Sequence, residues 1–196
     1  MTAKTMTVRR VVFVVAALNL AYFAVEFTAA LLIGSVSLFA DSIDFLEDAS
    51  VNCLIAVALV WSATSRARLG MVLAGTLLVP SFATLWTAWE KFKSLAPPAP
   101  LALSLVGTGA LVVNLSCALM LVRYRAHSGS LTRAAFLSAR NDAVANVAII
   151  AVGLVTAFTR SAWPDLIVGL GIAAINADAA RQVWNAAHEE HKAARA

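Results

Sequence analysis

The chain has 196 residues, of which 61% are hydrophobic and only 13% are charged. Soluble domains usually carry about 25% charged residues, so this composition excludes an ordinary water-soluble globule. The net charge of +4 comes without any basic stripe interleaved with aromatic side chains, which argues against nucleic-acid binding.

Apolar stretches follow one another along the chain, and each is long enough to cross a bilayer, which takes about 20 residues. In chain order they are Val11–Ile33, Leu38–Ser62, Gly70–Trp89, Leu101–Val122, Ala134–Phe158 and Pro164–Trp184. The first continues well past the apolar part of a signal peptide, so we expect it to remain as a membrane helix. We therefore predict an all-α membrane protein, a bundle of six transmembrane helices that forms a single domain over 1–196.

The Lys and Arg residues between these stretches are unevenly distributed. The side that would hold both termini carries Lys4, Arg9, Arg10, Arg66, Arg68, Arg123, Arg125, Arg133, Arg181, Lys192 and Arg195. The opposite side carries Lys91, Lys93 and Arg160. Because Lys and Arg collect in the short cytoplasmic loops of membrane proteins, both termini are predicted to be cytoplasmic. The net positive charge then reflects topology and contact with anionic headgroups.

Acidic residues inside the apolar stretches are the informative feature of the sequence. They are Glu26, Asp41, Asp44, Glu47, Asp48, Asp142 and Asp178. A carboxylate near the bilayer centre costs roughly 2.5–3.5 kcal/mol even on the mildest scale, so several would not persist without a function or a partner. The pattern indicates an ion or proton pathway. Asp178, close to the predicted cytoplasmic end, can simply reach water.

Helix geometry places part of this acidic set on one stripe. Asp44 and Asp48 are spaced i, i+4, so they lie one turn apart on the same face. Asp41 lies a turn earlier and Asn52 a turn later, and Glu47 lies on the flank of this ladder. Two carboxylates this close are expected to share a proton, which an arriving cation would displace. The stripe therefore predicts metal–proton exchange.

The fifth stretch offers a matching pair of oxygen ligands. Ser138 and Asp142 have the same i, i+4 spacing, with Asn141 beside them. Two such pairs on facing helices can enclose a four-coordinate divalent cation.

The segments Gly34–Asp48 (GSVSLFADSIDFLED) and Ser138–Ala143 (SARNDA) resemble the membrane domain of the cation diffusion facilitator (cation efflux) family. The first is similar to that family's G-S-x-x-L-x-A-D-S segment, followed by its metal pair, here Asp44 and Asp48. The second is similar to its fifth-helix pair. The similarity runs from about Arg9 to Trp184 and includes further positions: Asn19, Glu26 and Trp163-Pro164-Asp165.

This resemblance implies a six-helix exporter of divalent zinc, cobalt, iron, manganese or cadmium that works by alternating access against protons. Its metal ligands would be Asp44, Asp48, Asp142, Ser138 and Asn141, with Asp41, Asn52 and Glu47 as gate or accessory residues. The metal is cargo, and no prosthetic group is expected. The expected partners are the metal ion, protons, the lipid bilayer and a second copy of the chain, in the plasma (inner) membrane of a bacterium.

The sequence departs from the family pattern in two respects. Many relatives have histidine in a metal pair, whereas His127, His188 and His191 lie outside the apolar stretches. Ser138 is neutral, so Asn141, a water molecule or a three-carboxylate site are the alternatives for the fourth ligand. The family's cytoplasmic C-terminal domain is also expected to be missing. An oxygen-rich site favours manganese, iron or cobalt, and zinc also accepts carboxylates.

Other interpretations compete with metal transport. The acidic residues could be structural, with Arg140 paired to Glu47 or Asp41, and Glu26 and Asn19 could be hydrogen-bonding contacts between helices. Asp41-x-x-Asp44-x-x-x-Asp48 superficially resembles the motif of metal-dependent phosphatidyl-alcohol transferases, but Phe45 replaces that motif's glycine. No nucleophile–base set lies in the spans, so no catalytic residue is predicted. The remaining alternative is a non-transporting helical subunit of a membrane complex.

Overall fold

The computed structural model describes residues 3–58, 82–122 and 130–193. Side chains at 3–8, 55, 57–58, 130–140 and most of 179–193 lie outside this description. The described chain forms α1 (Ala3–Ile33), α2 (Val36–Ala58), α4 (Pro100–Val122), α5 (Ser130–Thr159) and α6 (Trp163–Ala193), with a further helical segment at 82–94. No strand occurs in these ranges. The prediction of an all-α protein is confirmed for the part that the structure describes.

Several helices extend beyond the apolar stretches that mark them in the sequence. Helix α1 begins at Ala3 rather than Val11, and α6 continues past Trp184 to Ala193. Hydropathy marks only the part of a helix that crosses hydrocarbon, and a helix can continue into water with a polar sequence. The end of the predicted second span (59–62) and the first part of the predicted third span (70–81) lie outside the described residues. The helical segment at 82–94 ends beyond Trp89.

Three of the described helices are long and apolar enough to cross a membrane by length and composition: Arg9–Ile33, Pro100–Val122 and Asn141–Thr159. Helix α2 has no such window because it carries four carboxylates, Asp41, Asp44, Glu47 and Asp48. Large apolar side chains also point outward, among them Leu32 at 81% and Phe158 at 89% exposure. Such an apolar exterior suits contact with lipid.

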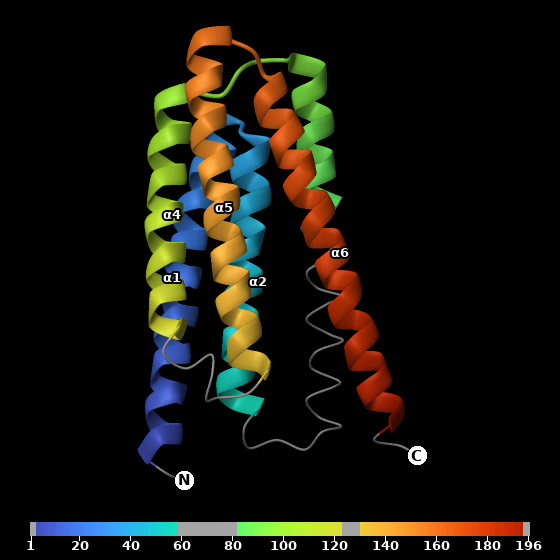
Figure 1. Ribbon diagram of the computed structural model, residues 1–196. Coiled ribbons are helices and arrows are strands. Elements are labelled where there is room, and N and C mark those ends of the chain that lie inside the picture. The colour runs from blue at the N-terminus through green and yellow to red at the C-terminus, as the bar shows by residue number, and fades with distance from the viewer. Residues whose placement is uncertain (1–2, 59–81, 123–129, 194–196) are drawn as a thin grey trace.

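The helices run side by side in one bundle, and both ends of the described chain lie at the same end of it (Figure 1). Helix α1 packs mainly against α2, and α4 packs mainly against α5. Helix α6 contacts α2 and α5 near its N-terminus and diverges from the bundle toward its C-terminus (Figure 1). We call the end that holds the turn between α1 and α2 the closed end.

Three turns at the closed end stop their helices by the same device, a residue in the left-handed conformation. Gly34 has φ 63° and ends α1, with the Ser35 amide donating to the Ala30 carbonyl at 3.0 Å. Leu95 (φ 46°) and Arg160 (φ 49°) end the segment 82–94 and α5. A left-handed residue just past the last turn satisfies carbonyls that have no partner inside the helix.

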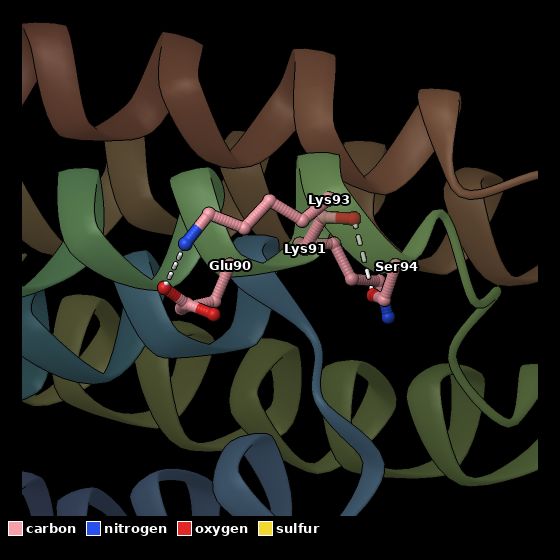
Figure 2. Close-up of polar contacts among 4 residues, drawn as sticks. All are labelled: Glu90, Lys91, Lys93 and Ser94. Carbon is pink, nitrogen blue, oxygen red and sulfur yellow. Dashed lines mark hydrogen bonds and ion pairs between the residues drawn. The ribbon is translucent and has the colours of Figure 1, made fainter.

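The last turn of the segment 82–94 is also tied by its own side chains. Lys93 Nζ lies 2.8 Å from Glu90 Oε1, and the Ser94 hydroxyl donates to the Lys91 carbonyl at 3.2 Å (Figure 2). The Leu95 amide donates to the same carbonyl at 2.7 Å. The Lys93–Glu90 pair is exposed and contributes little, but the bonds to the Lys91 carbonyl fix where the helix ends.

Candidate cation site

Carboxylates from two helices line one cavity of about 140 Å³ in the bundle. We call it the acidic cavity and define it by its lining residues: Asp44, Glu47, Asp48, Asn141, Asp142, Ile175 and Asn176. They come from α2, α5 and α6. The sequence placed the acids of α2 and α5 on facing stripes, and this cavity brings them together.

The predicted ladder on α2 divides into two groups. At about 100° per residue, Asp48 lies about 40° to one side of Asp44, and Asp41 and Asn52 lie about 60° and 80° to that same side. Glu47 lies about 60° to the other side. The described lining of the acidic cavity accordingly includes Asp44, Asp48 and Glu47 but not Asp41 or Asn52. On the side of the helix where Asp41 and Asn52 lie, the lining therefore reaches as far as Asp48.

Asn52 has a structural contact of its own. Its Nδ2 donates to the Asp48 carbonyl at 2.8 Å, and its side chain is 1% exposed. This hydrogen bond lies within α2 and does not connect α2 to another helix. Asn52 is also not among the residues that line the acidic cavity. Its role as a gate or accessory residue stays a prediction.

Two of the predicted ligands on opposite helices lie close together. The carboxyl groups of Asp48 and Asp142 are within hydrogen-bonding reach of each other across the α2–α5 boundary. Among the described residues, however, no three His, Cys, Asp or Glu side chains converge into a ready-made metal-binding set. The arrangement is therefore a cavity with carboxylates on its wall, which a cation would have to draw together.

The remaining predicted ligands are not brought into the cavity to the same extent. Asn141 is exposed and touches the cavity rim. Ser138 belongs to α5, but its side chain lies outside the described residues, as do those of Arg140 and His191. His188 is exposed on α6, and His127 lies outside the described ranges.

Asp41 faces away from the acidic cavity into a fully buried polar cluster. Its Oδ2 accepts from Asn146 Nδ2 at 2.5 Å, and Asn146 Oδ1 accepts from Asn114 Nδ2 at 2.9 Å. Asp41 and Glu26 are both 0% exposed, and their carboxyl groups lie within hydrogen-bonding reach of each other. This cluster links α1, α2, α4 and α5.

A different carboxylate, Asp165, fastens α6 to the N-terminus of α2. Its Oδ1 accepts from the hydroxyls of Ser35 and Ser37, both at 2.7 Å, and from the Ser37 amide at 3.1 Å. Its Oδ2 accepts from the Val36 amide at 2.8 Å. The amides are the unpaired donors of the first turn of α2, where a negative charge is also favoured by the helix dipole. We call Ser35, Val36, Ser37 and Asp165 the α2–α6 lock.

Lys91 supports the lock from the segment 82–94. Its Nζ donates to the Gly34 carbonyl at 2.6 Å, which ties this segment to the turn between α1 and α2. Lys91 lies beyond the predicted span Gly70–Trp89. Burial lowers the pKa of Lys91, and the nearby Asp165 carboxylate partly offsets this by raising it.

Sequence reasoning missed three polar residues that organise these sites, Asn114, Asn146 and Asn176, and it gave Asp165 no role of its own. Asn176 lines the acidic cavity and donates to the Ala40 carbonyl at 3.4 Å. Asn146 follows Asp142 at i+4. The signal that could have found the asparagines is the one used for the acids, a lone polar residue in an apolar span.

These observations define an integral membrane protein whose helices enclose a small, carboxylate-lined cavity. The sequence matches the cation efflux transmembrane domain family over residues 12–186, most of the chain. The chain therefore belongs to the cation efflux family, and the predicted family is confirmed. It is a multi-pass membrane protein of a transporter family, and its cargo is a metal cation. Comparison with curated proteins gave no match.

Proposed function

We propose that this protein exports a divalent transition-metal ion in exchange for protons, by alternating access. Asp44, Asp48 and Asp142 would be the ligands. The observation that supports this proposal is the acidic cavity, which collects carboxylates from α2 and α5 in a small volume within an apolar bundle. Carboxylate oxygens bind manganese, iron, cobalt and zinc, and each must lose its proton to do so. Metal arrival would therefore release protons.

The fourth ligand would be Asn141, Ser138 or water, or the three carboxylates would hold the metal by themselves. Asn141 touches the cavity rim, which supports it. We further propose that both termini are cytoplasmic and that the protein works as a homodimer in the plasma membrane of a bacterium. The common position of both chain ends supports placing the two termini on one side of the membrane (Figure 1).

The two ends of the bundle suggest how access would alternate. The α2–α6 lock and Lys91 hold α2, α6 and the segment 82–94 together at the closed end. Helix α6 diverges from the others toward the opposite end (Figure 1). With cytoplasmic termini, the lock lies on the non-cytoplasmic side of the acidic cavity, and export would require it to open.

Metal flux into proteoliposomes under a pH gradient tests the proposal. Zn²⁺, Co²⁺, Mn²⁺ and Fe²⁺ should be compared for the wild type and for Asp142→Asn. We expect flux of at least one metal that depends on the pH gradient and is lost in the variant. Flux that is independent of the pH gradient would refute exchange with protons. No flux of any metal through the folded wild-type protein would refute metal export.

A further inference from the structure

Glu26 of α1 is a fully buried carboxyl group that the proposed metal site does not use. Its side chain is 0% exposed, and no donor from another described residue reaches either Oε1 or Oε2. Asp41 of α2 is equally buried, and its Oδ1 also lacks a donor among the described residues. An ionised carboxylate left in this condition would be very costly, because burial without hydrogen bonds removes its solvation.

The two groups nevertheless lie within hydrogen-bonding reach of each other. Two ionised carboxylates cannot form a hydrogen bond, since neither has a donor. One shared proton supplies that donor and also removes one of the two buried negative charges. The contact therefore requires a proton, and a single proton is enough to supply its hydrogen bond.

The surrounding amides indicate which of the two groups carries the proton. Asn146 Nδ2 is a donor, and it binds Asp41 Oδ2 while Asn146 Oδ1 is occupied by Asn114 Nδ2. Asp41 therefore accepts from α5 and is stabilised as the carboxylate. Glu26 receives no such donor, so the proton resides on Glu26, which donates it to Asp41 Oδ1.

Within the part of the chain that the structure describes, no neighbouring group replaces this proton as a donor. Tyr22 is the nearest titratable group on α1, but its hydroxyl donates to the Val106 carbonyl at 2.6 Å. The other charged neighbours are acids, Asp44 on α2 and Asp142 on α5. On α4 the Cys117 thiol is directed to Asn19 Oδ1 at 3.7 Å, and the described polar neighbour on α6, Asn176, does not titrate.

We propose that Glu26 and Asp41 form a proton-binding site, separate from the acidic cavity, that holds one proton and releases it when a cation binds near Asp44. Asp44 follows Asp41 by three residues on α2, so a cation there would lie about one turn away. Its positive charge would favour the doubly ionised pair. The release step rests on the proposed metal transport, whereas the proton-holding step does not.

The test of the proton-holding step is infrared difference spectroscopy of the protein in lipid, as pH is raised without metal. A protonated carboxylic acid has a carbonyl band distinct from that of a carboxylate. We expect this band in the wild type and a reduced band in both Glu26→Gln and Asp41→Asn. The exposed Asp178→Asn is the matched control and should leave the band intact. An unchanged band in both folded pair variants would overturn the proposal.

The release step is tested by adding Mn²⁺ or Zn²⁺ to the same samples and measuring released protons. Glu26→Gln keeps a donor to Asp41 and should fold and bind metal, but release about one proton fewer per bound ion. Equal release from Glu26→Gln and wild type would overturn the release step. If neither metal binds to the wild type, the proposed function fails, while the pH-difference spectra still decide whether the pair holds a proton.

Discussion

The α2–α6 lock and the acidic cavity both contain carboxylates on or beside α2. The two regions differ in what surrounds these carboxylates. Asp165 in the lock receives four hydrogen bonds, two of them from backbone amides. Among the described residues, the charged neighbours of Asp44 and Asp142 at the acidic cavity are other acids. A carboxylate surrounded by donors is held in place as an anion, whereas carboxylates surrounded by acids need a cation or a proton. The first arrangement fastens helices, and the second can exchange ligands.

The largest effect should come from removing a carboxylate of the acidic cavity. Asp48→Ala should lower metal flux into proteoliposomes by more than about 100-fold, because even outer partners of metal ligands are worth about 10–100-fold. It should leave thermal stability largely unchanged, since the loss relieves repulsion among acids. Asp178→Asn, on the exposed surface of α6, should transport normally. A large loss of stability with normal flux would mean that Asp48 holds the helices together and does not bind the metal.

The close approach of α6 to α2 gives the next prediction. A Cβ added at Gly169 would lie 2.7 Å from the Ser37 amide nitrogen and the Val36 carbonyl carbon, both rigid backbone atoms. Gly169→Ala should therefore cost about 1–3 kcal/mol by overpacking, measured as a lower melting temperature in detergent. Gly171 on the same helix meets nothing within 4 Å, so Gly171→Ala is the matched control and should be neutral. Equal effects would show that α2 and α6 are not packed this closely.

Replacing the carboxylate of the lock should have a comparable or smaller effect on stability. Asp165→Asn places an amide NH₂ against donors from α2, so about 1–3 kcal/mol should be lost through an unsatisfied buried group. Melting temperature and proton leak through proteoliposomes are the measurements. We expect lower stability and an increased leak, because the closed end would open more readily. Unchanged stability would mean that the lock does not hold the helices together.

The smallest effect is expected at the turn that precedes the lock. Gly34 has φ 63°, and a Cβ there would meet only Lys91 Nζ at an ordinary 3.7 Å. Gly34→Ala should then cost about 1–2 kcal/mol from backbone strain alone. Gly34→Asn, which tolerates this conformation better, should recover part of the loss in the same melting assay. A larger loss for Asn than for Ala would indicate crowding against Lys91 instead.

Local features of the sequence were sufficient for the fold class and for part of the site. Apolar length predicted the helices, because a bilayer requires about 20 apolar residues whatever their neighbours are. The i, i+4 spacing of Asp44 and Asp48 placed them on one face, since a helix has a fixed period. The facing position of Asp142 came from family resemblance together with the same spacing, and the acidic cavity agrees with it.

The partners of each acid were decided only by the tertiary structure. Asp41 is next in the same stripe as Asp44, yet it turns toward Glu26 and Asn146 because the stripe drifts around α2 across the boundary between two neighbouring helices. Asp165 is 128 residues from Ser37 in sequence and 3.1 Å from its amide in space. Spacing along one helix gives the direction of a side chain, but the helix it meets depends on how the bundle packs. Sequence alone therefore determined that Glu26, Asp41 and Asp48 lie inside the bundle, and packing determined whether each one meets a donor or another acid.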